Sequence, residues 1–368
     1  MNTRQVVVIP GDDAAPEAMA PVVSLIGSLV PEIDWQYPLV GEAAIEATGH
    51  ALPNDTKTLI DSSETTLFGS TSGKSGAALF YLRWGKQTYA NVRPTRWFPG
   101  YKSSLADPEG VDFIIVRENL EDLYLGIEGD VPELAELGLK SRTSRRPLAE
   151  FDGRYALKVI TDAGSRRVIT KAFELARTRR GKLTATSKYN MLSYTDGLFR
   201  DVAIDVARDF PDVEFETFIV DDFAHRLCKR PQDFDVVVMP NLYGDILSDA
   251  AAGLVGGLGM AASGCYGDDY AYFESAHGTA PDIAGQHVIN PTATLLSACM
   301  MLDYMGMNEV STRIHGAIAE VYAEGRVLTP DQGGNASTTD LCDAILARCQ
   351  TRRKAKEYPD AHWNRLST

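Results

Sequence analysis

The chain contains Val236-Val-Val-Met239 and, one residue later, Asn241-Leu-Tyr-Gly-Asp245-Ile-Leu-Ser-Asp249, an apolar run followed by the start of a helix. Asp245 and Asp249 are four residues apart, so both carboxylates lie on one helical face. Like charges at this spacing repel by roughly a few tenths of a kcal/mol, so we expect a helix N-terminus, a basic partner or a divalent cation to offset them. Two hard oxygen ligands favour Mg²⁺ or Mn²⁺. The alternative is a solvated acidic helix start.

Short apolar runs alternate with helical patterns along the rest of the chain, which is typical of an α/β protein. The other runs are Val6 to Ile9, Thr65 to Phe68, Phe113 to Val116, Leu157 to Ile160, Leu183 to Thr186 and Glu214 to Val220. Helices are expected after Pro16 and near residues 162–179, 196–209, 291–304, 310–323 and 340–349. A length of 368 residues with 44% hydrophobic residues predicts two domains, or one large α/β body with a lobe.

The composition argues against several classes of partner. A net charge of −14 disfavours nucleic acid and anionic membranes, which attract clustered lysine and arginine. No apolar stretch reaches the ~18 residues of a membrane span, so we expect a soluble cytoplasmic protein. The five cysteines are scattered without a CxxC pair, and reduced thiols are therefore predicted.

Two segments stand apart from the α/β pattern. The basic, turn-rich run Lys140-Ser-Arg-Thr-Ser-Arg-Arg-Pro147 is interpreted as an excursion from the core that contacts another subunit. The polar tail Gln350 to Thr368 is expected either to be partly disordered or to dock through Trp363.

Three arginines fall near the ends of predicted elements: Arg83 in Tyr-Leu-Arg-Trp, Arg93 in Ala-Asn-Val-Arg-Pro and Arg117 in Ile-Val-Arg-Glu-Asn. Guanidinium groups at such positions can converge on a carboxylated ligand with bidentate geometry. Tyr124 follows Arg117 by seven residues. Each arginine taken singly is more often a surface charge.

Together with the acidic helix and the run Phe273-Glu-Ser-Ala-His-Gly-Thr-Ala-Pro-Asp-Ile-Ala-Gly285, these residues form a longer pattern. The chain resembles the metal-dependent β-decarboxylating dehydrogenases, the family of isocitrate, isopropylmalate, homoisocitrate and tartrate/D-malate dehydrogenases. The resemblance runs from about Val6 to Cys349, and over Phe234 to Gly285 it is closest to NAD-dependent isocitrate dehydrogenases.

The resemblance implies an α/β, isopropylmalate/isocitrate dehydrogenase-like two-domain fold with a mixed sheet. This is not a Rossmann fold, and the sequence has no GxGxxG. Residues 1–88 and 256–368 would form a large cofactor-binding domain. Residues 89–255 would form a small inserted domain with the dimer interface and the metal site, and the active site would lie in the cleft between the domains.

The resemblance also implies the roles of individual residues. Arg83, Arg93 and Arg117 would bind the carboxylates of a malate-like substrate, and Tyr124 would be the acid near the decarboxylated carbon. Lys188 and Asp221 would come from the neighbouring subunit of a homodimer. Asp221, Asp245 and Asp249 would hold Mg²⁺ or Mn²⁺. Asn190, in Ser-Lys-Tyr-Asn, would contact the substrate, unless it is an ordinary turn residue.

Asp282 and Ile283 indicate the cofactor. Relatives that use NADP carry a Lys-Tyr pair here to meet the 2′-phosphate, whereas an aspartate repels that phosphate and can hydrogen-bond the ribose hydroxyls of NAD. The resemblance also implies that His277, Gly278 and Asn290 line the adenosine. The first loop, Gly11-Asp-Asp-Ala-Ala-Pro16, has Asp13 and Ala15 where the family usually has glycines, which reduces backbone freedom.

The substrate's C3 substituent is left open by the sequence. Isocitrate enzymes present a serine and an asparagine where this chain has Ala77 and Leu79, and Leu79 matches isopropylmalate enzymes. The polar run Ser70-Thr-Ser-Gly-Lys-Ser75 suggests instead that Lys74 receives an acidic group, unless the loop is merely solvated. An isocitrate-like substrate is expected, and the alternatives are homoisocitrate, 3-isopropylmalate, tartrate, D-malate or a phosphonate such as 3-(phosphonomethyl)malate.

Two other classes of protein share features with this sequence. The run Gly69-Ser-Thr-Ser-Gly73-Lys74-Ser75 resembles a P-loop, but three residues separate its glycines where four are needed. A non-catalytic regulatory subunit of an oligomeric isocitrate dehydrogenase would tend to have lost site residues. All of the expected arginines, aspartates, Lys188 and Tyr124 are present, which favours an active enzyme.

Overall fold

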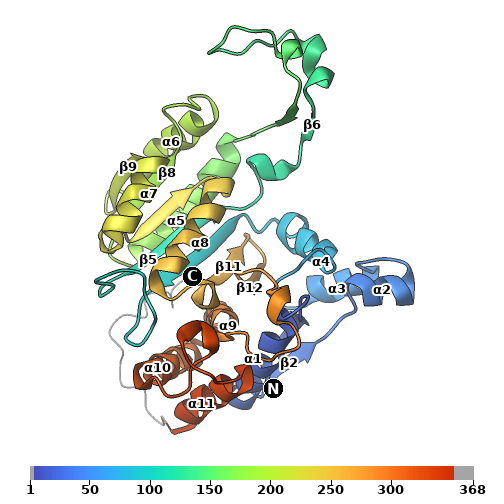
Figure 1. Cartoon of the computed structure of the whole chain (residues 1–368), viewed down its shortest axis with the longest axis vertical. Coiled ribbons are helices and arrows are strands. Elements are labelled where there is room, and N and C mark those ends of the chain that lie inside the picture. Colours follow the sequence, from blue (N-terminus) through green and yellow to red (C-terminus); the bar gives the residue numbers. More distant parts are fainter. Residues whose placement is uncertain (1–3, 352–368) are drawn as a thin grey trace.

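A single large mixed β-sheet forms the centre of the computed structural model, which describes residues 4–351 (Figure 1). Its strand order is β2-β1-β3-β12-β11-β4-β5-β10-β8-β9. Neighbouring strands are parallel except at β12–β11, β11–β4 and β4–β5. The strands are β1 Arg4–Ile9, β2 Ile33–Gln36, β3 Thr65–Phe68, β4 Ala90–Arg96, β5 Asp112–Glu118, β8 Lys182–Ser187, β9 Glu214–Ile219, β10 Val236–Met239, β11 Ala262–Tyr266 and β12 Ala271–Ser275. The mixed α/β fold expected from the sequence is thus confirmed.

Helices cover both faces of this sheet. One face packs against α1, α5, α6, α9, α10 and α11, and the other against α3, α4, α7 and α8. The helices are α1 Ala15–Leu29, α2 Gly41–Thr48, α3 Asn54–Ser62, α4 Gly76–Phe80, α5 Asp162–Arg177, α6 Thr195–Val206, α7 Val220–Lys229, α8 Asn241–Val255, α9 Thr292–Tyr304, α10 Asn308–Glu324 and α11 Thr338–Thr351.

Alternation along the strands explains the two layers. In β5, Ile114 and Val116 join the core beneath α5, whereas Phe113 and Ile115 join the core beneath α7 and α8. Successive side chains of a strand point to opposite faces, so a strand buried on both sides reads as a continuous apolar run. This is why the apolar runs of β1, β5, β8 and β10 could be recognised in the sequence.

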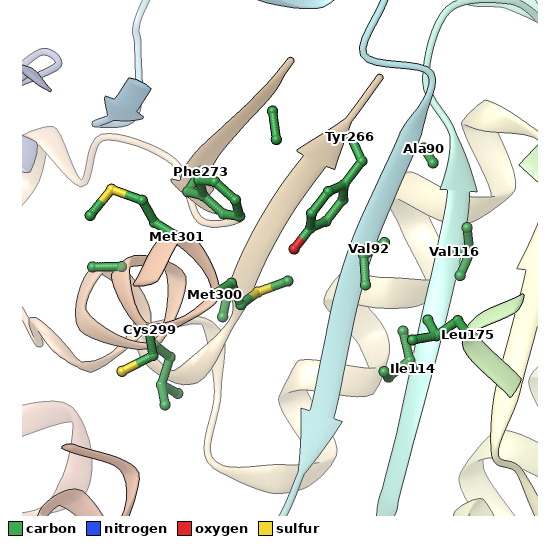
Figure 2. Close-up of a cluster of buried hydrophobic side chains, with 14 of the residues drawn as sticks. Ala90, Val92, Ile114, Val116, Leu175, Tyr266, Phe273, Cys299, Met300 and Met301 are labelled. Carbon is green, nitrogen blue, oxygen red and sulfur yellow. The ribbon is translucent and has the colours of Figure 1, made fainter. Parts of the chain in front are cut away.

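The middle of the sheet has a closely packed core (Figure 2). Tyr266 of β11 and Phe273 of β12 pack edge to face, with ring centroids 5.6 Å apart. Figure 2 shows these rings above Met300 of α9 and beside Val92 of β4. This core joins strands that lie far apart in the sequence and so fixes β4, which carries one of the expected site arginines.

One expected strand is wrong. Leu157 to Ile160 is not a strand; the strand nearby is Arg154–Ala156, and only Val159 forms an isolated bridge, to Asp122. Leu157 is exposed, and Lys158 makes ion pairs instead of facing a neighbouring strand. The apolar residues of this segment therefore do not form a strand of the sheet.

The expected excursion is confirmed. Two short antiparallel strands, β6 Glu128–Asp130 and β7 Arg154–Ala156, lead to a segment that projects from the body at the top of Figure 1. Leu137 and Leu139 on this arm are 64% and 50% exposed. That the arm contacts another subunit stays a prediction.

Other expectations have different outcomes. The five cysteines are free, as predicted. Of the expected tail, residues 352–368 with Trp363 lie outside the described residues. Among residues 4–351, none of the helices has the length and apolar character needed to cross a bilayer.

The division into domains 1–88 with 256–368, and 89–255, stays a prediction. Strands β4 and β11, which come from the two expected domains, pair within one sheet.

Candidate active site

Three buried arginines meet at one end of the central strands. Arg117 lies near the end of β5 and is in register with Met239, the last residue of β10. Arg93 lies on the adjacent β4, and Arg83 lies in a π-helical turn after α4. All three line a cavity of about 200 Å³. The cavity residues are Ser70, Thr71, Leu79, Arg83, Arg93, Arg117, Tyr124, Asp245, Glu274, Ser275, Ala276, His277 and Gly278.

Arg117 is held by the first turns of α8. Its Nε and Nη2 donate to Oδ1 of Asn241 at 2.9 and 2.6 Å, and its Nη1 forms an ion pair with Asp245. Burial and the nearby charge of Arg93 lower the pKa of Arg117 to about 10, so it remains cationic at neutral pH. Since the strand β10 runs directly into α8, the chain itself delivers these partners to Arg117.

Asp245 and Asp249 share the second cation, Arg93. Its Nη2 lies 3.4 Å from Oδ1 of Asp245, and its Nη1 lies 3.2 Å from Oδ1 of Asp249. Burial alone would raise the pKa of Asp245, but Arg117, the Tyr124 hydroxyl and Arg93 hold it below its usual range. Burial raises the pKa of Asp249, and the charge of Asp245 adds to this. The charges of Arg93 and Arg117 oppose this rise in the pKa of Asp249 only in part.

Tyr124 completes this group. Its hydroxyl donates to Oδ2 of Asp245 at 2.5 Å, and its ring lies 4.9 Å from the guanidinium carbon of Arg117. Burial and the hydrogen bond to Asp245 raise the pKa of Tyr124. The phenol therefore keeps its proton at neutral pH and can act as a proton donor.

Lys188 and Asp221 form a separate pair. Lys188 follows β8, Asp221 lies in the first turn of α7, and Nζ is 2.5 Å from Oδ1. Neither residue lines the cavity, nor does Asn190, which is exposed. Within residues 4–351, no three His, Cys, Asp or Glu side chains gather as a metal site. Asp245 and Asp249 alone fit a hard cation as two oxygen ligands, and a third would have to come from elsewhere.

A second cavity, of about 360 Å³, adjoins the first. Its residues are Leu258, Gly259, His277, Gly278, Ala280, Ile283, Ile289, Asn290 and Asp331. His277 and Gly278 line both cavities. Nε2 of His277 is buried without a hydrogen-bond partner among residues 4–351, and burial lowers the pKa of the ring. A neutral ring with an unsatisfied nitrogen fits a polar heterocyclic ligand.

Asn290 is fixed in this second cavity by its neighbours. Its Nδ2 donates to Oδ2 of Asp331 at 2.9 Å and to the Tyr322 hydroxyl at 3.2 Å, and its Oδ1 accepts from the backbone of Thr292. Ile283 lines the cavity, while Asp282 is exposed and does not. The cofactor residues expected from the sequence thus lie at this cavity, with Asp282 on the adjacent turn.

The loop that contains Lys74 begins at a backbone contact. A Cβ atom on Gly69 would lie 2.1 Å from the carbonyl oxygen of Pro10, and one on Gly11 would lie 2.5 Å from that of Ser70. Asp12 then accepts hydrogen bonds from Thr71, Ser72 and Ser75, and these bonds hold its pKa low against the effect of burial. Lys74 is exposed and does not line the cavity, and its role stays a prediction.

Sequence reasoning missed several residues of the site. Glu274 lines the first cavity, with Oε1 3.5 Å from Nη2 of Arg83. Asn241 orients Arg117, and Asp331 orients Asn290. Glu274 lies in the run from Phe273 to Gly285, and Asn241 begins the run that ends at Asp249. Their places in these two motifs could have indicated that they belong to the site.

The known proteins that are similar to this chain are isocitrate and isopropylmalate dehydrogenases. Residues 5–345 match the family described as isocitrate/isopropylmalate dehydrogenase. The chain is 38% identical over 351 residues to the 3-isopropylmalate/3-methylmalate dehydrogenase of Methanocaldococcus jannaschii, covering 94% of this chain and 98% of that protein. It is 38% identical over 355 residues to the mitochondrial isocitrate dehydrogenase [NAD] subunit alpha of Macaca fascicularis, covering 94% and 96%. The crystal structure of isocitrate dehydrogenase from Methylococcus capsulatus has a TM-score of 0.80 at 35% identity, covering 94% and 99%.

Gly244→Ala should destabilise the protein. A Cβ atom at this position would lie 2.5 Å from Cγ and 2.6 Å from Cβ of Arg117, so strand or helix must move. We expect the free energy of unfolding, from denaturant titration at fixed protein concentration, to fall by about 1–3 kcal/mol.

Gly253→Ala is the matched control in the same helix, because a Cβ atom there would have no heavy-atom neighbour within 4 Å among residues 4–351. Alanine has a higher helix propensity than glycine, so this substitution should raise the free energy of unfolding by up to about 1 kcal/mol. Equal effects of the two substitutions would contradict the close contact between α8 and Arg117.

Proposed function

Because the chain belongs to the isocitrate/isopropylmalate dehydrogenase family, we propose that it oxidises and decarboxylates a 3-substituted malate, with NAD and Mg²⁺ or Mn²⁺. The products are a 2-oxo acid, CO₂ and NADH. Members of this family are decarboxylating dehydrogenases that act on small hydroxy acids with a divalent metal and NAD or NADP. The observation that carries the proposal is that the arginine-lined cavity and the second cavity meet at His277 and Gly278.

The three arginines bind and orient the substrate carboxylates. Arg83, Arg93 and Arg117 present forked donors into a cavity of about 200 Å³. Their side chains are at most 10% exposed, so little water competes for these donors. Glu274, Asp245 and Asp249 pair with these arginines in this structure, so a divalent cation at the two aspartates would release the arginines for an anionic ligand.

Asp245 and Asp249 of one subunit and Asp221 of the partner subunit would hold the divalent cation. The cation would polarise the substrate hydroxyl and carboxylate and stabilise the negative charge left by loss of CO₂. Burial raises the pKa of Asp249, and a bound cation would favour its charged form.

Lys188 of the partner subunit would remove the hydroxyl proton, and Tyr124 would donate a proton to the carbon that loses CO₂. Bound NAD would supply the hydride acceptor for the oxidation. The 2.5 Å contact between Lys188 and Asp221 supports their delivery to the partner's site as a unit. Their side chains are 30% and 67% exposed in one chain, as residues that complete a neighbouring site need to be. A homodimer with two shared sites follows.

The substrate's C3 substituent would lie against Ser70, Thr71 and Leu79. Ser70 and Thr71 make this side of the cavity polar, as an acidic, isocitrate-like group requires, but their hydroxyls would have to give up their bonds to the His277 carbonyl and to Asp12 to bind it. Leu79 favours 3-isopropylmalate as a second candidate, because an apolar side chain cannot hydrogen-bond a carboxylate. A screen for NADH formation with Mn²⁺ over isocitrate, homoisocitrate, 3-isopropylmalate, D-malate, tartrate and 3-(phosphonomethyl)malate tests the proposal. Turnover that is abolished by EDTA and by Asp245→Asn supports it, and no turnover with any of these acids overturns it.

We expect NAD to be preferred over NADP by at least about tenfold in kcat/KM, because an aspartate beside the 2′-phosphate should cost more than about 1.4 kcal/mol. Steady-state kinetics with each cofactor measures this. Asp282→Lys with Ile283→Tyr should reduce the preference, and equal use of the two cofactors by the wild type would contradict the assignment.

Lys188→Ala and Tyr124→Phe should each be nearly inactive alone and should recover activity as mixed dimers. One of the two hybrid sites then holds both intact side chains, so about half of the wild-type activity is expected if the sites act independently. Differently tagged subunits allow the heterodimer to be purified and assayed. A verified heterodimer without activity would mean that Lys188 serves its own subunit.

Lys74→Ala tests whether the loop after Ser70 receives an acidic C3 substituent. If it does, KM for the true substrate should rise by about tenfold to a hundredfold, the scale of one charge-assisted hydrogen bond. KM for D-malate, which lacks the substituent, should change much less. Equal changes for both substrates, or none, would make Lys74 a solvated loop residue.

A further inference from the structure

A buried ion cluster outside the cavity connects the two catalytic segments. The ammonium of Lys158 lies 3.3 Å from Oδ1 of Asp122 and 3.0 Å from Oδ2 of Asp196. Both aspartates are fully buried, and the lysine side chain is 13% exposed. The ring centroid of Tyr243 lies 4.4 Å from the same ammonium. The two carboxylates and the ring face together match the three donors of an ammonium group.

Asp122 holds the segment that carries Tyr124. Its Oδ1 accepts from the backbone N–H of Leu123 at 2.9 Å, and its Oδ2 accepts from that of Leu242, in the first turn of α8, at 3.1 Å. Asp122 itself has φ +70 and ψ −144, a conformation that an L-residue rarely adopts. Such a conformation persists only where the surroundings enforce it. The Tyr124 turn is therefore tied to the helix of Asp245 through one side chain.

Asp196 holds the segment that carries Lys188. Its Oδ1 accepts from the backbone N–H of Lys188 at 2.8 Å, and its backbone carbonyl accepts from Oγ of Ser187 at 2.9 Å. Lys158 therefore bridges the carboxylate that fixes the Tyr124 segment and the carboxylate that fixes the Lys188 segment. The cluster touches neither the substrate cavity nor the second cavity.

We propose that Lys158 is a positioning residue that joins the Tyr124 turn and the Lys188 segment into one rigid unit. The role in catalysis rests on the proposed function, in which Tyr124 serves the site of its own subunit and Lys188 serves the partner's site. Lys158 then links the proton donor of one site to the base of the other, so loss of the ammonium loosens both sites together.

Neutralisation of buried charge is the competing explanation for the cluster. Removing the ammonium leaves two buried carboxylates unpaired, which by itself destabilises a protein. The variant Lys158→Met with Asp122→Asn and Asp196→Asn leaves no unpaired charge. Asp196→Asn keeps an amide oxygen for the backbone N–H of Lys188, whereas Asp122→Asn leaves one acceptor oxygen where Asp122 uses two, so the exchange of residues 187–197 is the readout that this variant decides. A positioning role predicts that the variant folds but that this segment stays impaired, whereas neutralisation alone predicts its recovery.

Lys182 offers a matched control. Its ammonium also bridges two carboxylates, at 3.5 Å from Glu214 and 3.1 Å from Glu216, but it lies at the opposite end of β8 from Lys188. Lys182→Met therefore removes a doubly paired lysine without touching either catalytic segment. Its glutamates are 70% and 28% exposed, so this variant controls for the loss of a lysine, and the triple variant controls for the buried charge.

The experiment combines hydrogen–deuterium exchange with steady-state kinetics on the full-length protein. Lys158→Met and the triple variant should raise the exchange rates of residues 120–126 and 187–197 by at least about threefold. They should lower kcat by about 10- to 100-fold while KM changes less than about threefold, because the arginines that bind the carboxylates are untouched. Lys182→Met should do neither.

Unchanged exchange in either segment, a recovered triple variant, or faster exchange with unchanged kcat would overturn the proposal, as would the same effects in Lys182→Met. If the wild type turns over none of the hydroxy acids, the proposed function fails. The exchange measurement needs no substrate and still decides whether Lys158 joins the two segments.

Discussion

The buried Arg117 guanidinium is the constraint around which the site is organised. At 2% exposure its charge cannot be solvated, so it requires anionic and polar partners close by. Asn241 and Asp245, both in the first turns of α8, provide them. Because α8 begins directly after β10, and β10 pairs with β5, the strand register decides which residues reach Arg117. Fold and site geometry are thus set by the same pairing.

The fold could be predicted where strands are buried on both faces. The runs in β1, β5 and β10 are apolar at every position, so they stand out without knowledge of the tertiary structure. β4 was not recognised, since Asn91, Arg93 and Pro94 interrupt its apolar pattern. The prediction of a strand from Leu157 to Ile160 was wrong for the opposite reason: the run is apolar at three of four positions, but Leu157 is exposed and only Val159 forms a bridge.

The site could be predicted where long motifs carry it. Arg83, Arg93, Arg117, Tyr124 and Asp245 do line one cavity, and His277, Ile283 and Asn290 line the adjoining one. The contacts of Asp12, Lys158 and Asp196 could not be predicted. Each joins residues that are distant in sequence, and a lysine or an aspartate in a loop reads as an ordinary surface charge until the tertiary structure buries it.

The backbone contact between Gly11 and Gly69 also bears on how this protein can diverge. Any side chain at Gly69 collides with main-chain atoms, and Asp12 secures the loop again at Ser75. Both ends of the loop are therefore anchored by features that tolerate little change. Of the exposed residues between them, Ser72 binds Asp12 through its backbone N–H and Gly73 has φ +113°, so Lys74 is the position whose side chain can change without loss of the anchor. New substrate preferences can arise here by drift at few positions, while the arginines, the carboxylates and the sheet beneath them stay as they are.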